Sequence, residues 1–132
     1  MAEGLAKVIL GSEYEIQSAG SSPGSKVNPY AVRVLAEKSI DISHQHPKAW
    51  HRLPTSFLTK VDFLITLCAE EMCPVIDVKG EKLHWGFPDP AEVIGSEEYK
   101  LSRFREIRDA ITQQLETFKS KTEAKDGSNT SR

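Results

Sequence analysis

The sequence of 132 residues has few cysteines, no extended apolar stretch and no excess of positive charge. Its two cysteines are too few for a disulfide-stabilised scaffold, which favours a reducing, cytoplasmic compartment. No apolar run approaches the roughly 20 residues of a membrane span, and Met1-Ala2-Glu3 lacks the cationic start of a signal peptide. The 17 basic and 19 acidic residues give a net charge of −2. We therefore expect a cytoplasmic protein that binds neither membranes nor nucleic acids.

Apolar residues at helical spacing predict a first helix over Ala2–Leu10, which Gly11 ends. A second helix is predicted by its start signals. Asn28 is a good N-cap, and Pro29 suits the first helical position, where its missing N–H costs nothing. This helix should run to about Lys38.

The last predicted helix starts at Ser96, where a capping residue precedes two acidic residues. Its apolar residues recur every three or four positions: Leu101, Phe104, Ile107, Ile111, Leu115 and Phe118. We expect one domain over residues 1–122, followed by a disordered tail over residues 123–132, which are small and polar.

Short segments between the helices predict strands at Tyr14–Ser18 and at Phe63–Leu67, with a further one at Pro74–Val78 or Lys82–Trp85. The continuous apolar run Phe63–Leu67 is typical of a strand buried on both faces, and hence of a parallel sheet. The order of elements predicts an α/β fold with helices on both faces of the sheet.

Cys68 follows the predicted strand Phe63–Leu67, at the edge of the sheet where α/β proteins bind ligands. Cys73 comes five positions later. A disulfide needs Cα atoms roughly 4.4–6.8 Å apart, whereas five extended steps span about 17 Å, so the segment must curl to close one. The spacing alone favours two buried thiols over a redox switch, and a zinc site would need more ligands at closer spacing.

Asp89 lies between Pro88 and Pro90 in an aromatic loop, and the two prolines hold the chain extended. A carboxylate held stiffly beside aromatic rings could have a raised pKa and act as a general acid. An ordinary turn aspartate is the more frequent case.

His44, His46 and His51 fall in the polar, turn-prone segment over residues 39–54. No cysteine or carboxylate cluster accompanies them, which favours a solvated loop over a metal site. The charged residues of the last helix likewise favour a solvated face over a partner-binding site.

Nine segments, in their order and spacing, resemble the arsenate reductases built on the low-molecular-weight protein tyrosine phosphatase fold. They are Met1-Ala2-Glu3-Gly4, Ser18-Ala19-Gly20, Val27-Asn28-Pro29, Ile40-Asp41-Ile42, Thr66-Leu67-Cys68, Cys73-Pro74, His84-Trp85-Gly86-Phe87, Asp89-Pro90-Ala91 and Phe104-Arg105-Glu106-Ile107-Arg108-Asp109. The resemblance runs from Met1 to about Lys119. It implies a four-stranded parallel sheet in a flavodoxin-like arrangement and the reduction of arsenate for arsenic detoxification.

The resemblance also implies a nucleophilic cysteine in a Cys-(five residues)-Arg phosphate loop placed directly before Met-Ala-Glu-Gly. Residues 1–132 contain no such motif. We therefore expect that the first, central strand and its loop are absent from this chain, through a start codon assigned too late or an in-frame UGA that encodes selenocysteine. The polypeptide alone should then be inactive, and unstable or prone to aggregation.

The resemblance assigns a role to three residues. Asp89 matches the general acid that protonates the departing oxygen of the oxyanion. Cys68 matches the thiol that attacks the cysteine–arsenate adduct, releases arsenite and forms a disulfide. Cys73 matches the thiol that takes over this disulfide and presents it to thioredoxin or glutaredoxin.

Beyond this thiol electron donor, we expect no cofactor and a monomeric enzyme that binds arsenate or phosphate. Some members of the family bind potassium through a Glu, a Ser and an Asp. Glu3 and Ser18 match the first two ligands, but Lys48 aligns with the third, so we expect no potassium site.

Two alternatives to a reductase stay open. The chain could be a phosphatase for phosphotyrosine or small phosphate esters, although such enzymes need no pair like Cys68 and Cys73. It could also be a non-catalytic remnant or binding module of the same fold.

Overall fold

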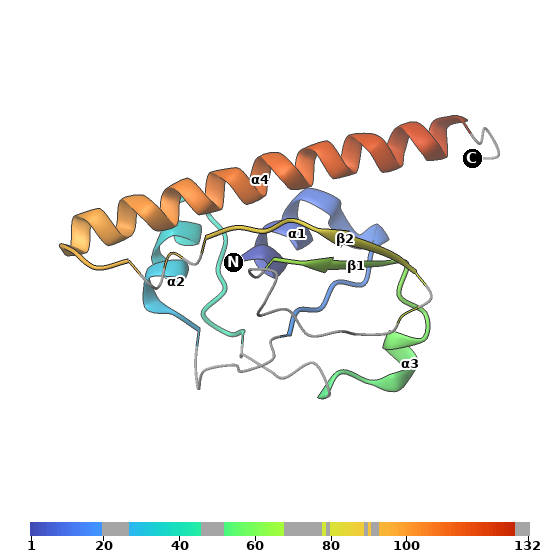
Figure 1. The fold of residues 1–132 in the computed structure, drawn as a ribbon, viewed down its shortest axis with the longest axis horizontal. Coiled ribbons are helices and arrows are strands. Elements are labelled where there is room, and N and C mark those ends of the chain that lie inside the picture. The colour runs from blue at the N-terminus through green and yellow to red at the C-terminus, as the bar shows by residue number, and fades with distance from the viewer. Residues whose placement is uncertain are drawn as a thin grey trace.

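The computed structural model of the chain describes residues 1–19, 27–45, 52–67, 78, 80–88, 90 and 93–128. Its elements are, in order, α1 (Ala2–Leu10), η1 (Gly11–Glu13), α2 (Pro29–Ala36), α3 (Thr55–Leu58), β1 (Phe63–Thr66), β2 (Glu81–His84) and α4 (Glu97–Ser128). Figure 1 shows α4 lying across the length of the molecule, with α1, α2 and the two strands beneath it. None of the described helices is long and apolar enough to cross a membrane.

Helix α1 has the predicted bounds. Leu5 and Ala6 are buried against the other helices, and Gly11 ends the helix with a φ of 73°, its N–H bonded to the carbonyl of Lys7. A positive φ costs glycine little, so the predicted stop signal is confirmed.

Helix α2 begins as predicted, because the Asn28 side chain accepts a hydrogen bond from the Tyr30 N–H at 2.9 Å. It ends at Ala36, slightly before the predicted end at Lys38. There the backbone turns through Ser39, with a φ of 62°, and the Ile40 N–H bonds to the Leu35 carbonyl at 3.0 Å. This closing turn satisfies a terminal helix carbonyl in the manner of a Schellman motif.

The predicted strand over Tyr14–Ser18 is wrong. The chain is extended at Tyr14, with φ −120° and ψ 139°, but in the described part of the chain no strand pairs with this segment. Its last residue bonds to a helix instead, since the Ser18 N–H donates to the Glu3 carboxylate. An extended segment becomes a strand only where a neighbour accepts and donates its backbone hydrogen bonds.

Strands β1 and β2 are parallel, as predicted, with Phe63 opposite Glu81 and Thr66 opposite His84. Every side chain of β1 is only partly buried, so the expectation of a strand buried on both faces is wrong. The reason is that the described sheet has only these two strands. An α/β fold is confirmed. The absence of a first, central strand stays a prediction.

Gly80, just before β2, allows the two strands to begin close together. The Glu81 N–H donates to the Asp62 carbonyl at 2.9 Å. A Cβ atom at Gly80 would lie 2.3 Å from the Val61 carbonyl oxygen, which is far inside contact distance. Because the obstructing atoms are backbone, only glycine fits here.

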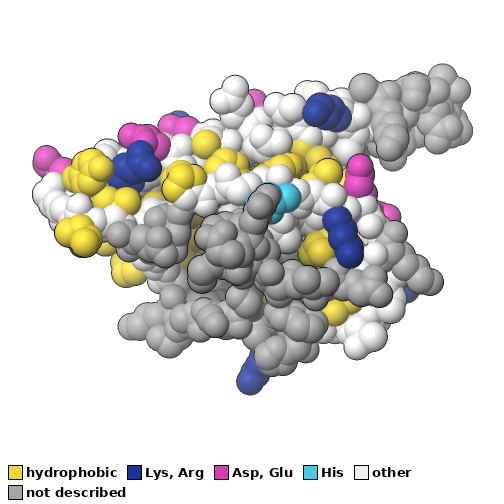
Figure 2. All heavy atoms as spheres, viewed as in Figure 1, with side chains coloured by type: hydrophobic (Ala, Val, Ile, Leu, Met, Phe, Trp, Pro, Cys, Tyr) yellow, Lys and Arg dark blue, Asp and Glu magenta, His cyan; other side chains and the backbone are white. Residues whose placement is uncertain are grey.

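Helix α4 provides six of the twelve buried apolar residues in the described part of the chain. The Ser96 hydroxyl accepts the Tyr99 N–H at 3.1 Å, which confirms the predicted cap. All six apolar residues predicted for its buried stripe are buried: Leu101, Phe104, Ile107, Ile111, Leu115 and Phe118. Both α1 and α2 pack against α4. Figure 1 shows α4 and the short helix α3 on opposite sides of the two strands. Figure 2 shows a band of hydrophobic side chains along the border between α4 and the elements beneath it.

The end of α4 differs from the prediction. The helix runs on to Ser128, into the residues 123–132 predicted as a disordered tail, while residues 129–132 lie outside the described part. Over residues 119–123, the part past Phe118 whose side chains are described, the helix buries no apolar residue, but Lys119 and Glu123 stand at the favourable i, i+4 spacing, 3.9 Å apart.

The prediction that the charges of the last helix form a solvated face is wrong for Arg108. Its side chain is buried, and one guanidinium nitrogen donates to the Val34 carbonyl at 2.9 Å and to Glu37 at 2.8 Å. Arg105 binds the same Glu37 carboxylate through two nitrogens. Arg105 and Arg108 of α4 therefore stabilise its contact with α2 through charged hydrogen bonds.

Candidate active site

The carboxyl ends of the parallel strands β1 and β2 lie at the same edge, where parallel α/β sheets bind ligands. The ladder continues past both strands, since the Trp85 N–H donates to the Thr66 carbonyl at 2.8 Å and the Phe87 N–H to the Leu67 carbonyl at 3.1 Å. In Figure 1 both strands point toward the side of the molecule where the chain begins. This edge is the candidate active site.

The three residues predicted to act in catalysis, Cys68, Cys73 and Asp89, lie outside the described residues. Their chain neighbours are described. Leu67, which precedes Cys68, and Phe87, two positions before Asp89, are joined by the last hydrogen bond of the ladder. The roles of the three residues stay predictions.

At the end of the two strands, the Thr66 hydroxyl lies 2.6 Å from Nδ1 of His84. The same hydroxyl lies 3.5 Å from the Leu83 carbonyl, a longer and weaker contact. His84 is exposed, whereas Thr66 is half-buried. Sequence reasoning missed this pair, because it depends on the register that places Thr66 directly opposite His84.

A second cluster lies at the first turn of α1, around the buried carboxylate of Glu3. One carboxylate oxygen accepts the Ser18 N–H at 2.8 Å and the Ser18 hydroxyl at 2.7 Å, and the other accepts the Lys7 ammonium at 3.0 Å. The resemblance implied that Glu3 and Ser18 come together, and they do. Lys7 was missed, although its i, i+4 spacing from Glu3 could have indicated the pair. Lys48 lies outside the described residues, so the expectation of no potassium site stays a prediction.

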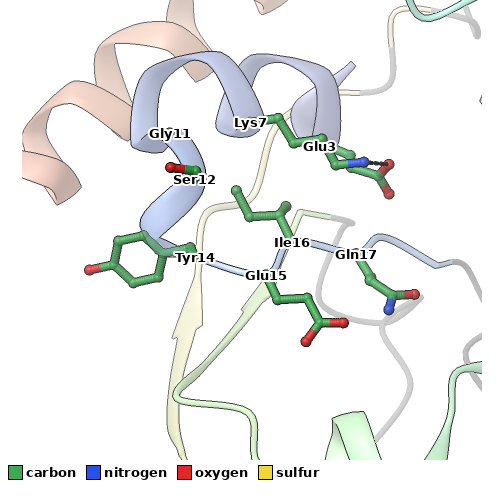
Figure 3. Close-up of a pocket in the computed structure, with 8 residues that line it drawn as sticks. All are labelled: Glu3, Lys7, Gly11, Ser12, Tyr14, Glu15, Ile16 and Gln17. Carbon is green, nitrogen blue, oxygen red and sulfur yellow. Dashed lines mark hydrogen bonds and ion pairs between the residues drawn. The ribbon is translucent and has the colours of Figure 1, made fainter.

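A groove of about 640 Å³ runs beside this cluster, between α1 and the extended segment that follows η1. Figure 3 shows Lys7 and Glu3 on one wall, Ile16 pointing toward α1, and Glu15 and Gln17 pointing away from it. The ammonium of Lys7 is already paired with Glu3, and Glu15 adds a second negative charge. This groove therefore does not suit an anionic substrate.

Among the described residues, the pKa that is shifted to a stated value is that of Glu37, which lies between α2 and α4. Hydrogen bonds from Arg105, and then from Arg108, lower the pKa of Glu37 to about 2. The contacts with Asp109 and Glu37 in turn raise the pKa of Arg108, and the Arg108 contact lowers that of Asp109. Both arginines are used in joining the helices, so this cluster is structural and not an anion-binding site.

Of the three histidines considered for a metal site, only His44 is described, and it is exposed. His46 and His51 lie outside the described residues. Among the described residues, no group of three or more histidine, cysteine, aspartate or glutamate side chains could hold a metal ion.

Comparison with known proteins places these features in context. A profile of the family described as low molecular weight phosphotyrosine protein phosphatase matches residues 1–128. The arsenate reductase of Halalkalibacterium halodurans is 41% identical over 120 residues, which cover 89% of this chain and 84% of that protein. Among solved structures, an arsenate reductase in the reduced state has a TM-score of 0.72 and 26% identity, over 91% of this chain and 86% of that one. The thioredoxin-dependent arsenate reductase of Corynebacterium glutamicum has a TM-score of 0.53 and 29% identity, over 86% of this chain and 54% of that one.

Proposed function

Because the chain belongs to the low molecular weight phosphotyrosine protein phosphatase family, we propose that it acts as an arsenate reductase. The observation that carries this proposal is the similarity to a curated arsenate reductase over nearly the whole of both chains. The cysteine pair Cys68 and Cys73 supports it, because a hydrolytic phosphatase of this fold does not need two further thiols.

The proposed reaction passes one disulfide along three thiols. A nucleophilic cysteine displaces an oxygen of arsenate, which leaves as water after Asp89 supplies a proton. The Cys68 thiolate attacks the sulfur of this adduct, so that a disulfide forms while the As–S electron pair stays on arsenic, and arsenite departs. Cys73 then attacks Cys68, which releases the first cysteine and leaves a Cys68–Cys73 disulfide for the electron donor to reduce.

The nucleophile must come from outside residues 1–132, since these contain no Cys-(five residues)-Arg motif. We expect the loop to precede α1, whose N-terminus would help to bind the oxyanion together with the loop amides and arginine. Two described features support an additional strand beside it. β1 pairs with β2 alone, and the extended segment over residues 14–17 has no ladder partner among the described residues. Without the added segment, residues 1–132 should not reduce arsenate.

The electron donor in this proposal is thioredoxin or glutaredoxin, which reduces the Cys68–Cys73 disulfide by thiol exchange. The printed name of the Corynebacterium glutamicum relative, a thioredoxin-dependent enzyme, supports a donor of this kind. A reducing cytoplasm would keep both thiols reduced between turnovers. The proposal includes a monomeric enzyme without a metal or organic cofactor.

The test is arsenite production by a fused protein. A segment that carries a strand and a Cys-(five residues)-Arg loop is joined ahead of Met1, and arsenite is measured with thioredoxin, thioredoxin reductase and NADPH. Cys68→Ser should abolish arsenite release, because the thiol that attacks the adduct in the proposed relay is lost. Cys73→Ser should permit about one turnover and then stop, since the first disulfide cannot move on.

Ser56→Ala, an exposed change in α3, is the control and should turn over like the parent. Steady-state reduction that is unchanged in both cysteine variants would refute the relay. Faster release of phosphate from p-nitrophenyl phosphate than of arsenite from arsenate would instead favour the phosphatase alternative.

Asp89→Asn in the same fusion tests the general acid. The substitution keeps the size of the side chain but removes its acidic proton, so the rate of the chemical step should fall by about 10²–10⁴-fold. Phosphate binding, measured as competitive inhibition, should change little. A rate within a few-fold of the parent would exclude Asp89 from this role.

A further inference from the structure

The first turn of α1 carries a buried carboxylate at the end of the helix where the proposed function places the oxyanion. Glu3 is the second residue of α1, and its side chain is only 9% exposed. Each helical residue rises about 1.5 Å, so the backbone of Glu3 lies within the first turn from the helix N-terminus. A carboxylate at this position interacts favourably with the helix dipole, but it repels a second anion bound at the same end. An oxyanion therefore binds better there when the charge of Glu3 is balanced.

The carboxylate of Glu3 is held in this place by Ser18. One carboxylate oxygen, Oε1, accepts the Ser18 N–H at 2.8 Å and the Ser18 hydroxyl at 2.7 Å. Both donors belong to a residue 15 positions further along the chain, so the two bonds tie the extended segment that follows η1 to the first turn of α1. A side chain with these bonds does not turn away into solvent. Its negative charge stays at the start of the helix.

Lys7 brings a positive charge to the same carboxylate. Its Nζ lies 3.0 Å from Oε2 of Glu3, the oxygen that Ser18 does not use, and Figure 3 shows this contact as a dashed line. Helical side chains lean toward the N-terminus, so the ammonium lies near the first turn although the backbone of Lys7 lies one turn further on. The Lys7 side chain is 52% exposed, so it can be replaced with little loss of packing.

The ion pair has no net charge, whereas Glu3 without Lys7 carries one negative charge. An oxyanion interacts with this charge only while it is bound, so the charge changes the free energy of the bound state and not that of the free protein. Two unit charges about 10 Å apart, at an effective dielectric constant of about 20, change a dissociation constant roughly tenfold. Screening by salt reduces this factor. Loss of the Lys7 charge should therefore weaken oxyanion binding roughly three- to twentyfold.

We propose that Lys7 sets the affinity of the enzyme for its oxyanion by neutralising the buried carboxylate of Glu3 at the N-terminus of α1. Lys7 is a positioning residue in this role, since it acts through Glu3 and does not touch the oxyanion. The proposal rests on the proposed function for the place of the oxyanion at α1. It does not depend on the relay between Cys68 and Cys73.

The experiment measures the dissociation constant of inorganic phosphate for the fused protein, by isothermal titration calorimetry at low and at high sodium chloride. Lys7→Met should raise the constant roughly three- to twentyfold at low salt, and the difference from the parent should shrink at high salt. Lys7→Arg keeps the charge and should stay within about twofold of the parent. Lys60→Met is the matched control, because Lys60 is exposed and precedes β1, at the amino end of the strand, so its loss should have no effect beyond about twofold.

Glu3→Gln separates the effect of charge from that of a merely structural link. The glutamine keeps an oxygen that can accept from Ser18 but has no charge, so the charge of Lys7 is then unbalanced and phosphate should bind more tightly than to the parent. The double variant Glu3→Gln with Lys7→Met is neutral, like the ion pair, and should return to within about threefold of the parent. A pair that only maintained the shape of α1 would give weaker binding in all three variants.

An unchanged constant in Lys7→Met at low salt would overturn the proposal, and so would weaker binding in Glu3→Gln or an arginine variant as weak as the methionine variant. Absence of phosphate binding by the parent fusion would overturn it as well. The two proposals fail separately, because phosphate binding requires no turnover. A constant that depends on Lys7 in a fusion that makes no arsenite would refute only the reductase, whereas arsenite production with a constant independent of Lys7 would refute only the role of Lys7.

Discussion

Glu37 is the residue that joins the charged groups between α2 and α4. It ends α2 and accepts hydrogen bonds from Arg105 and from the buried Arg108, whose guanidinium also donates to the Val34 carbonyl. Loss of the Glu37 negative charge would leave the buried Arg108 guanidinium with one fewer charged acceptor. A buried charge that loses a partner lowers the free energy of unfolding. The stability of the contact between α2 and α4 should therefore decrease at acid pH.

The pH dependence of stability has a definite sign. The pKa of Glu37 is about 2 in the folded protein, below its usual value of 4.5. Its contribution is therefore complete above about pH 4.5 and is lost as the pH falls toward 2. We expect the urea midpoint of the parent to fall more steeply between pH 5 and pH 3 than that of Glu37→Gln, which has no carboxylate to titrate.

Glu13→Gln serves as the control, because Glu13 is exposed and forms no ion pair among the described residues. The control should follow the parent across the same pH range. Parallel curves for the parent and Glu37→Gln would show that the network does not contribute to acid stability.

The residues of the candidate site were predictable to different degrees. Asn28 was assigned from local sequence, because a helix cap involves near neighbours, whereas Glu3 was assigned through the family resemblance and its i, i+4 partner Lys7 was missed. The buried state of Arg108 and the bond between Thr66 and His84 could not, because each depends on which distant segment lies opposite. Cys68, Cys73 and Asp89 were assigned through the family resemblance, and their geometry lies outside the described residues.

At the level of elements, helices α1 and α4 were predictable because their apolar stripes are local and strongly periodic. The segment Tyr14–Ser18 was not, since an extended segment becomes a strand only through a partner. The parallel pairing of β1 with β2 was expected from the alternation of strands and helices, whereas the exposure of β1 was not, because a run of apolar residues does not report how many neighbouring strands are present.

Phe118 is the residue through which α4 holds the sheet. Its ring contacts Phe63 of β1 and Trp85 just after β2, both in edge-on geometry. Phe118→Ala should lower the free energy of unfolding by about 3 kcal/mol, through lost burial and the cavity left behind. In a Trp50→Phe background, the emission of Trp85 should also move to longer wavelength as its ring gains water.

The neighbouring change Thr117→Ala controls for effects on the helix itself. Thr117 is exposed, and its hydroxyl bonds only to the Gln113 carbonyl one turn earlier, so the loss should stay within about 0.5 kcal/mol. Equal stabilities for the two variants would mean that α4 does not support the sheet through Phe118.

For the whole molecule, the packed domain should end soon after Phe118. It is the last buried apolar residue of α4 among the side chains that the structure describes, although the helix continues to Ser128. Deleting residues 123–132 from the fused protein should keep its free energy of unfolding within about 0.5 kcal/mol, because every buried core residue of α4 among the described side chains precedes the deletion. Thermal and urea unfolding of the shortened and full chains would test this.

A chain shortened to residues 1–114 provides the contrast. It loses Leu115 and Phe118, and each large apolar side chain contributes about 2–5 kcal/mol. Such a loss approaches the whole stability of an ordinary domain, so this chain should not unfold cooperatively. Similar stability for both truncations would place the boundary of the domain earlier along α4.

The packing of α1 and α2 on α4 also constrains how the protein reaches its fold. Both N-terminal helices bury their apolar faces against a helix that begins only at Glu97. During synthesis, these faces lack their partner α4 until the ribosome has translated most of it and released it from the exit tunnel. Most contacts of α1 and α2 with α4 must therefore form after α4 has been translated, and nascent chains stalled before Phe118 should be substrates for chaperones and proteases.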